Sequence, residues 1–421
     1  MIRRPLFYLS AGEPSGDLHA AGLIRELKAR FPDARFVGFG GPEMEKAGCR
    51  LEVDLTESPV MWFLQALVKI PFFARCLKRA REFFRREKPD ILILIDYPGF
   101  NFRLAKIARE EGIRVCFFVP PQIWAWAQGR VEKMRRDIDF TISPLPFEQK
   151  WLASRGVETV AIPHPFFEEI KSQPFDLDFM RGLAGDEAAA LTRPAPSYGP
   201  CPLPPNPVLT LLPGSRRSEI AANLPEMARA AACAARSVPG LRPVVAAFKE
   251  EFVPLISKIL RRESLEFPVY VGKTRELIAL GACALAVSGS VSIELLALAK
   301  PAVVYYRVGA FPLWFSRFFR RVRFISLVNL LAADACGESI FYPTRRAPAR
   351  PSEKERSLAL YPEFLTGRDL SAEAARPLIE WLAEPEKLAR RRTELARLRD
   401  RVSAGGSPFK LAADAIIARL E

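Results

Sequence analysis

The sequence contains no C-x-x-C motif, although it has seven cysteines. An odd number of scattered cysteines, several within apolar runs, favours reduced thiols and argues against a disulfide framework or a zinc site. No apolar run reaches the roughly 20 residues of a membrane-spanning helix, and the apolar stretch at the N-terminus is too short for a signal peptide. These absences predict a cytoplasmic protein with no membrane-spanning helix.

Acidic residues are in deficit. The chain has 62 Lys and Arg against 48 Asp and Glu, which gives a net charge of +14. A positive surface favours anionic partners. No nucleic-acid-binding module is recognisable, and arginines stand beside Phe and Trp in apolar segments. This context predicts an anionic membrane surface as a partner and no nucleic acid.

The length of 421 residues exceeds one typical hydrophobic core, so we expect two domains. Short apolar runs alternate with helical patterns in both halves, which predicts an α/β fold with parallel, doubly wound sheets. The proline-rich run RPAPSYGPCPLPPNP marks a linker. The expected divisions are a first domain at 1–175, a linker at 176–207, a second domain at 208–370 and C-terminal helices at 371–421.

The first expected strand, residues 6–10, ends in the glycine-rich turn AGEPSGD. Gly16 lets the backbone approach a ligand closely, and acidic and hydroxyl groups stand at the mouth of the turn. These groups belong to Glu13, Ser15 and Asp17. They are candidates for substrate binding or acid–base chemistry. The simpler alternative is that Ser15 or Asp17 caps the helix that follows.

A fully apolar run, ILILI at residues 91–95, is typical of a central buried strand. Asp96 follows it directly. Ligands of open α/β sheets bind beyond the carboxyl ends of the strands, where a carboxylate can act as a general base. The alternative roles for Asp96 are a helix cap and a structural ion pair.

Residues 58–86 are strongly apolar at first and strongly basic afterwards. The large apolar side chains are too many for one buried helix face. We interpret the segment as an amphipathic helix that lies on a bilayer or receives acyl chains; a core helix followed by a solvated helix is the alternative. The side chains expected to make these contacts are Met61, Trp62, Leu64, Leu67, Val68, Phe72 and Phe73.

Two turns in the second half have the composition of phosphate-binding sites. Each follows an apolar run and precedes a helical pattern, so backbone N–H groups and the positive helix end converge with hydroxyls or arginine. A carboxylate in the first turn of the second helix can accept hydrogen bonds from ribose hydroxyls. The residues are Gly214, Ser215, Arg216, Ser288, Gly289, Ser290 and Glu294. Packing of small residues could explain either turn alone, but two turns in one domain predict a nucleotide site.

In combination, these motifs resemble the bacterial lipid-A-disaccharide synthase family, of the GT-B glycosyltransferase architecture. The matching segments occur in the family's order: SAGEPSGDLHAAGLIRELK, FVGFGGPEM, IDYPGFNFRLAK, PPQIWAWAQGRVEKM, LLPGSRRSEI, SGSVSIELLALAKPAVVYYR, and VNLLA followed by YPEFL. The resemblance covers nearly everything outside the linker and residues 337–360. It implies two Rossmann-like domains facing a cleft, and C-terminal helices that cross back to the first domain or are swapped between subunits.

The resemblance also implies a reaction. In this family a 2,3-diacylglucosamine unit leaves UDP, with inversion, and joins the 6-hydroxyl of 2,3-diacylglucosamine 1-phosphate (lipid X), giving the lipid A disaccharide 1-phosphate and UDP. The family needs no metal and no cofactor. Its members are peripheral to the inner membrane on the cytoplasmic side, and a homodimer is compatible with the resemblance.

Matching motif to motif assigns roles by resemblance. Asp96 is the expected base for the acceptor hydroxyl, with Asp17 in reserve and Glu13 as a further acid of the catalytic group. The residues expected to hold the acceptor are Glu13, Ser15, Gly16 and Asp17. Those expected at the UDP-sugar are Gly214, Ser215, Arg216, Ser288, Gly289, Ser290, Glu294, Asn329 and Glu363.

Two positions depart from the family pattern. Gly99 stands where many members carry a second acid, and Thr366 takes the place of the usual glutamine after PEFL. Two alternatives stay open; the departures bear on the second, whereas the first-domain motifs WAW and IDYPGFN argue against the first. One is another GT-B enzyme of UDP-sugars, such as a peptidoglycan-type acetylglucosamine transferase or a sugar-nucleotide epimerase. The other is a membrane-surface protein that binds UDP-sugars without turnover.

Overall fold

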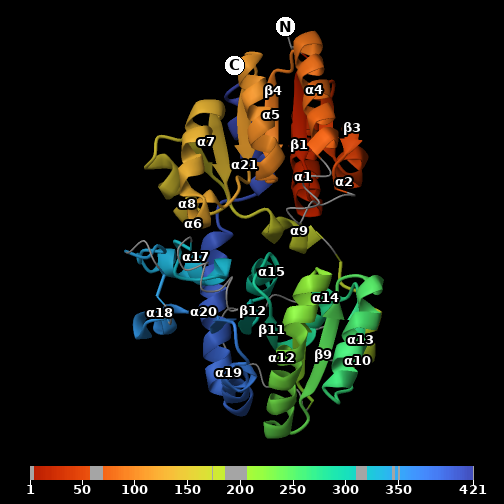
Figure 1. Cartoon of the computed structure of the whole chain (residues 1–421), viewed down its shortest axis with the longest axis vertical. Helices are drawn as coiled ribbons and strands as arrows, with labels where there is room; N and C mark the ends of the chain where they lie inside the picture. The colour runs from red at the N-terminus through yellow and green to blue at the C-terminus, as the bar shows by residue number, and fades with distance from the viewer. Residues whose placement is uncertain are drawn as a thin grey trace. The chain divides into compact units, whose positions relative to one another are not determined.

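The computed structural model describes residues 4–56, 70–172, 174–184, 206–309, 320–343, 347–348 and 351–420. The chain divides into two compact units (Figure 1). Unit 1 contains Met1–Pro165 and Gly405–Glu421, and unit 2 contains Phe166–Ala404. The division differs from the sequence-based limits, because it falls before residue 175 and returns the end of the chain to unit 1.

Unit 1 is built on a seven-stranded parallel sheet in the order β3-β2-β1-β4-β5-β6-β7. The order reverses between β1 and β4, so their carboxyl ends form a topological switch point, where ligands of open α/β sheets bind. The strands are β1 (Leu6–Ala11), β2 (Arg35–Gly40), β3 (Arg50–Asp54), β4 (Ile91–Ile95), β5 (Arg114–Phe118), β6 (Phe140–Ser143) and β7 (Thr159–Ala161).

Helices cover both faces of this sheet, as strands without polar alternation require. Every residue of β4 is fully buried. The helices of unit 1 are α1 (Pro14–Arg30), α2 (Pro42–Lys46), α4 (Ile70–Glu87), α5 (Pro98–Glu110), α6 (Ile123–Trp126), the 3-10 helix η1 (Gln128–Arg130), α7 (Val131–Asp137), α8 (Pro146–Ala153) and α21 (Pro408–Ile417).

The last helix, α21, lies against α1, although nearly 400 residues separate them in the chain. In Figure 1 the blue α21 lies among the red and orange elements of unit 1. Gly22 makes this approach possible, because a Cβ there would stand 2.5 Å from the ring of Phe409. Phe409 is buried in the core of unit 1. The end of the chain therefore supplies part of the hydrophobic core of unit 1.

Unit 2 has a six-stranded parallel sheet in the order β10-β9-β8-β11-β12-β13. Its switch point lies between β8 and β11, the strands that precede the two expected phosphate-binding turns. The strands are β8 (Val208–Leu212), β9 (Arg242–Ala247), β10 (Val269–Val271), β11 (Gly281–Ala286), β12 (Ala302–Arg307) and β13 (Glu363–Thr366).

The helices of unit 2 enclose its sheet, with α12 packed against α19. They are α9 (Phe166–Ser172), α10 (Leu177–Ala184), α12 (Arg217–Ser237), η3 (Glu250–Phe252), α13 (Val253–Arg262), α14 (Thr274–Leu280), α15 (Val291–Ala297), α17 (Leu327–Ala335), α18 (Glu353–Leu358), α19 (Ser371–Ala383) and α20 (Pro385–Val402). The two parallel, helix-covered sheets confirm the predicted α/β doubly wound fold class with a helical C-terminus.

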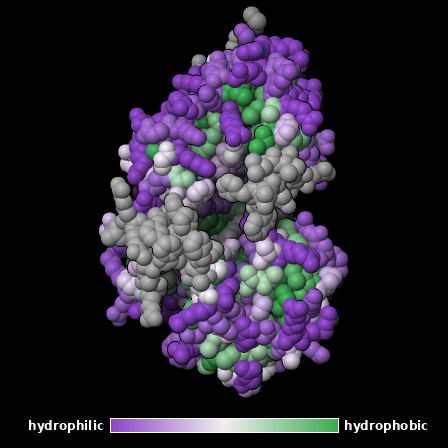
Figure 2. All heavy atoms as spheres, in the orientation of Figure 1, coloured by the Kyte–Doolittle hydropathy of each residue, from purple (hydrophilic) through white to green (hydrophobic). Residues whose placement is uncertain are grey.

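Most of the expected membrane segment lies outside the described residues, including Met61, Trp62, Leu64, Leu67 and Val68. Phe72 and Phe73, in the first turn of α4, are half-buried. Among the described helices, none combines the length and the apolar character needed to cross a membrane. On the face drawn in Figure 2, hydrophilic residues predominate on each unit and apolar residues show as smaller patches.

Candidate functional site

The switch point of unit 1 has an unusual backbone. Asp96 and Tyr97, directly after β4, have φ angles of 44° and 49°, and Val119, directly after β5, has a φ of 52°. This left-handed region is uncommon for residues other than glycine and is an outlier for a β-branched valine. Such residues cost about 1–3 kcal/mol each and cluster at functional sites. The strain therefore marks the ends of β4 and β5.

Asn101 holds this strained turn in place. Its buried side-chain amide donates to the carbonyl oxygens of Asp96 at 2.7 Å, Ile95 at 3.1 Å and Ser10 at 3.2 Å, and its Oδ1 accepts from the Ser10 hydroxyl at 2.7 Å. One amide thus joins the ends of β1 and β4. Asn101, the asparagine of the IDYPGFN segment, therefore has a structural role.

Gly12 provides the space for the Tyr97 ring. A Cβ at Gly12 would lie 2.3 Å from Cδ1 of Tyr97, closer than any real contact. The same ring lies 6.3 Å, centroid to centroid, from the ring of Phe73. The half-buried start of α4 therefore packs directly beside the Asp96 turn, which gives Phe73 a described contact at the site.

Burial raises the pKa of Asp96 to about 6, and the charge of Glu13 adds to the effect. The backbone N–H of Tyr97 and the side chain of His19 oppose the shift. A carboxylate with this pKa is ionised at neutral pH and is a stronger base than an ordinary aspartate. These are the properties of a general base.

The Asp17 carboxylate accepts hydrogen bonds from three backbone N–H groups. Its Oδ1 accepts from the N–H groups of Gly41 at 2.9 Å and Met44 at 3.0 Å, and its Oδ2 accepts from that of Glu43 at 2.9 Å. The side chain is buried. Asp17 therefore fixes the start of α2 against α1. These contacts favour a positioning role for Asp17 over the reserve base expected from the sequence.

The other residues of the first turn lie at the switch point. Glu13 is half-buried at the N-cap of α1 and makes no capping hydrogen bond through its side chain. Ser15 is half-buried in the first turn, and Gly16 is buried against Ile95. Glu13 and Asp96 thus contribute two interacting carboxylates from neighbouring strands.

The sequence reasoning missed Glu148, in the first turn of α8. This side chain is 1% exposed; Trp124 Nε1 donates to its Oε1 at 2.7 Å, and the Ser143 hydroxyl contacts its Oε2. Burial, with a smaller contribution from the charge of Asp96, raises the pKa of Glu148 to about 8. At pH 7 the acid is mainly neutral. The signal in the sequence was an acid within the apolar context PLPFEQKW.

Two buried histidines complete the described surroundings of Asp96. The rings of His19 and His164 lie 6.4 Å apart in an edge arrangement. Burial, followed by the influence of His19, lowers the pKa of His164 to about 3. His164 is therefore neutral throughout the physiological range.

In unit 2, the turn after β8 leads into the longest helix of the described chain. Gly214 has a φ of 118°, and a Cβ there would lie 2.8 Å from Oε2 of Glu219. Ser215 and Arg216 are exposed, and Arg216 is the N-cap of α12, with its guanidinium 3.2 Å from Glu219. The N-terminus of a long helix beside an exposed arginine suits a phosphate group.

The turn after β11 is the neighbouring turn of the same sheet. Ser288 donates its hydroxyl to the carbonyl of Ile325 at 2.7 Å, so this group is already used. Gly289 and Ser290 are exposed. Burial raises the pKa of Glu294 to about 7; Arg275 opposes the shift. Of this turn, the exposed residues and Glu294 are the ones available to a ligand.

Asn329 and Glu363 are hydrogen-bonded to each other and to neighbouring backbone groups. Glu363 Oε1 accepts from the Ser326 N–H at 2.9 Å and from Asn329 Nδ2 at 2.7 Å, and its Oε2 accepts from the Ile325 N–H at 2.7 Å. Asn329 also exchanges hydrogen bonds with the backbone of Tyr361 at 2.7 and 2.9 Å. Both side chains use their hydrogen-bonding groups within the protein, and these bonds fix the start of α17 to β13.

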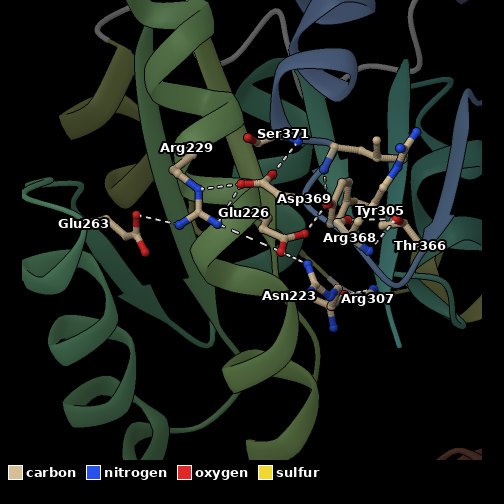
Figure 3. Close-up of polar contacts among 11 residues, drawn as sticks. Asn223, Glu226, Arg229, Glu263, Tyr305, Arg307, Thr366, Arg368, Asp369 and Ser371 are labelled. Carbon is tan, nitrogen blue, oxygen red and sulfur yellow. Dashed lines mark hydrogen bonds and ion pairs between the residues drawn. The ribbon is translucent and has the colours of Figure 1, made fainter. Parts of the chain in front are cut away.

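A polar network occupies the ends of β12 and β13 (Figure 3). Buried Glu226 of α12 accepts hydrogen bonds from Tyr305 and Arg307, and Arg229 pairs with Glu263 at 2.7 Å and Asp369 at 3.1 Å. Thr366 bonds to the carbonyl and N–H of Arg368 at 2.8 and 3.0 Å, and so closes the loop after β13. The Thr366 hydroxyl, at the position where the family pattern has glutamine, therefore stabilises this loop.

Two compact units, each built on a doubly wound parallel sheet with candidate residues in the turns at the carboxyl ends of its strands, define a GT-B-like fold. The Anabaena protein Alr3699/HepE, solved in complex with UDP and glucose, has this fold: it is 16% identical, with a TM-score of 0.52 and coverage of 99% of each chain. This likeness concerns the fold alone.

A family model described as lipid-A-disaccharide synthetase matches residues 7–192 and 202–344. The lipid-A-disaccharide synthase of Myxococcus xanthus is 36% identical over 79% of this chain and 82% of the relative. The lipid-A-disaccharide synthase of Trichlorobacter lovleyi is 30% identical over 96% of this chain and 94% of the relative. The chain belongs to the lipid-A-disaccharide synthase family, and it is a glycosyltransferase.

Proposed function

We propose that this chain transfers a 2,3-diacylglucosamine unit from UDP to the 6-hydroxyl of 2,3-diacylglucosamine 1-phosphate. The products are the lipid A disaccharide 1-phosphate and UDP. The observation that carries the proposal is Asp96, a carboxylate with a raised pKa at the strained switch point of unit 1. Family membership supplies the reaction class.

The acceptor is assigned to unit 1. Asp96 takes the proton of the 6-hydroxyl while that oxygen attacks the anomeric carbon of the donor from the face opposite UDP, so the configuration inverts. Burial, assisted by the charge of Glu13, keeps the pKa of Asp96 raised. General-base catalysis of this kind contributes about 10²–10⁴-fold.

The donor is assigned to unit 2. As the anomeric C–O bond breaks, its electron pair stays on the β-phosphate of UDP, and negative charge grows there. Arg216 and the N-terminus of α12 are suited to neutralise this charge, with Gly214 and Ser215 shaping the turn. Gly289, Ser290 and Glu294 are proposed to hold the diphosphate and ribose. We propose indirect roles for Ser288, Asn329 and Glu363, which shape this region.

The partners extend to the membrane in this proposal. Ile70, at the start of α4, is 51% exposed, and basic side chains such as Lys78 and Arg79 are exposed further along the helix. This pattern suits a peripheral position on the anionic cytoplasmic face of the inner membrane. Sedimentation with anionic vesicles at low and high salt tests it, and analytical ultracentrifugation tests the homodimer.

The purified protein, incubated with UDP-2,3-diacylglucosamine and lipid X, should release UDP and form the disaccharide in equal amounts. Turnover of UDP-acetylglucosamine without an acylated donor would favour a different nucleotide-sugar enzyme. Binding of the acylated donor without turnover would favour the binding protein. Mass spectrometry of the lipid product separates these outcomes.

A further inference from the structure

The geometry points to a phosphate-binding subsite on unit 1, formed by Trp126 and Arg130, that holds the phosphomonoester of the acceptor sugar. This inference rests on the proposed function and adds a site for one end of its acceptor. It comes from the arrangement of α6 and η1, which follow β5 in the WAWAQGR segment.

The first element of the subsite is a buried anchor. Trp124 is 1% exposed, donates its indole N–H to Glu148, and meets the ring of Phe147 edge-on at 4.9 Å. Gln128 donates to the carbonyl of Trp124 at 3.0 Å and ties η1 to α6. These contacts fix a helix of four residues that would be too short to be stable by itself.

The second element is an exposed aromatic ring. Trp126 lies two residues after Trp124, and on a helix residues two apart point to nearly opposite sides. Trp126 is 56% exposed. The Arg130 guanidinium lies over its ring, 5.0 Å from the centroid. A cation–π pair with a solvent-exposed ring adds little to stability, so folding alone gives little reason to fix these two groups on a rigid anchor.

The third element is the charge of Arg130. Within the described part of the chain, no acid forms an ion pair with Arg130, whereas its neighbours Arg135 and Arg136 pair with Glu132 and Asp137. A planar guanidinium binds phosphate through two parallel hydrogen bonds. Arg130 is thus oriented by an aromatic face and available to an anion.

The subsite lies at the same edge of the sheet as Asp96. β4 and β5 pair in parallel, with Ile95 opposite Phe118, and the Asp96 N–H faces the carbonyl of Val119 at 3.4 Å. The chain goes from Val119 through two prolines into α6. Trp124 also contacts Glu148, whose pKa responds to Asp96. The anchor of the subsite is therefore close to the proposed base.

The chemistry of the acceptor fits this placement. It is a sugar with a phosphate at C1 and its reacting hydroxyl at C6, at opposite ends of the molecule. Arg130 would bind the phosphate while the Trp126 face packs against the C–H groups of the sugar. Holding the phosphate at C1 would leave the 6-hydroxyl at the opposite end of the sugar, free of the subsite. The donor diphosphate has its own cation in Arg216.

Initial rates of Arg130→Ala, Arg130→Lys and Trp126→Ala test the subsite with two acceptors, lipid X and the same diacyl sugar without its phosphate. We expect Arg130→Ala to raise the KM for lipid X about 10–100-fold, the loss of a charge-assisted bond of about 1.5–3 kcal/mol. The kcat and the KM for the donor should stay within twofold. Arg130→Lys should recover part of the loss, and Trp126→Ala should raise the KM for both acceptors.

The matched control is Arg114→Ala, which removes the same charge from an exposed residue at the amino end of β5, the opposite edge of the sheet. An unchanged KM for lipid X in Arg130→Ala, or an equal rise for the acceptor without phosphate, would overturn the inference. The second result, with weaker binding to anionic vesicles, would assign Arg130 to lipid headgroups.

Direct binding separates this inference from the proposed reaction. Lipid X binding to wild type and Arg130→Ala is measured by equilibrium binding without donor. If wild type catalysed no transfer but Arg130→Ala still bound lipid X more weakly than wild type, the proposed reaction would be wrong and the subsite would be supported. Equal affinities in the two proteins would remove the subsite whatever the reaction.

Discussion

At the scale of single residues, the chemistry concentrates on carboxyl groups whose surroundings differ. Asp96 and Glu148 have raised pKa values because both are buried, whereas Asp17 and Glu363 accept several backbone N–H groups. The sequence presents all of them as acids near turns. From these contacts we propose a chemical role for Asp96 and positioning roles for the others.

Replacement of Asp96 by Asn should separate stability from activity. The folded pKa of about 6 lies above the ordinary value of 3.8, so the buried charge destabilises the fold above pH 6, and the cost disappears as the pH falls to about 4. Asp96→Asn should therefore be more stable than wild type at pH 7–8, by at most about 3 kcal/mol. Asparagine also tolerates the left-handed backbone.

Urea unfolding of Asp96→Asn and wild type at pH 4.5 and 7.5 checks this. In wild type, kcat/KM should fall as the pH drops through about 6, because the protonated acid cannot act as the base. A variant less stable than wild type at pH 7.5, or a flat activity profile down to pH 5, would contradict the assignment.

Glu148 offers a test of a neutral buried acid. In Glu148→Gln, the amide oxygen can still accept from Trp124 and the NH₂ can still donate to Ser143, so the unfolding free energy at pH 7 should stay within about 1 kcal/mol of wild type. Glu148→Ala leaves the buried indole N–H unsatisfied and opens a cavity, at a cost of about 2–4 kcal/mol. Equal losses in the two variants, measured by urea unfolding, would show that Glu148 carries a charge.

At the scale of elements, the proposed site residues of both units lie mainly in turns at the carboxyl ends of parallel strands. In unit 1, residues with left-handed backbone conformations follow β4 and β5, and they set the chain direction at Asp96 and before α6. In unit 2, the turns after β8 and β11 are adjacent because these strands pair, with Ala286 opposite Leu212. The sheet order thus brings together turns that are more than 70 residues apart in sequence.

Gly12→Ala tests the turn between β1 and α1. The added Cβ would displace the Tyr97 ring, and Tyr97 shares the left-handed turn with Asp96. We expect kcat to fall at least about tenfold, as misplacement by about 1 Å costs up to 10²-fold. The control is Gly99→Ala, where nothing lies within 4 Å of the new Cβ; its activity should match wild type. Comparable kcat values in the two variants would show that the Gly12–Tyr97 contact does not position the base.

At the scale of the whole molecule, the last segment of the chain completes the first unit. Phe409 fills the core beside Gly22, and Arg30 pairs with Asp414 at 2.9 Å. Phe409→Ala should destabilise unit 1 by about 3–5 kcal/mol, as expected for a buried phenylalanine. Arg30→Ala, which breaks an exposed ion pair, should cost at most about 1 kcal/mol.

Hydrogen exchange followed by mass spectrometry checks this for each unit. The peptides of β1 and α1 should lose protection in Phe409→Ala while those of β8 and α12 keep it. If Phe409→Ala left β1 as protected as in wild type, α21 would not be a structural part of unit 1.

Much of the fold was predictable because buried parallel strands are short apolar runs. ILILI became β4 at the expected residues. The resemblance left open whether the C-terminal helices cross back or are swapped, since a helical pattern does not say which core it joins; the structure places α21 in unit 1. Motifs also located Asn329 and Glu363 without showing their internal contacts. Glu148 was missed because only the folded chain brings it near Asp96.

The central claim is that Asp96 serves as the base of a glycosyl transfer whose UDP-sugar binds elsewhere, in unit 2. The most direct measurement is disaccharide formation from UDP-2,3-diacylglucosamine and lipid X by wild type and Asp96→Asn, with UDP affinity measured on the same samples. The account predicts product from wild type, a loss of about 10²–10⁴-fold in kcat for the variant, and UDP affinities within about twofold. A variant that forms the disaccharide at the wild-type rate would contradict it.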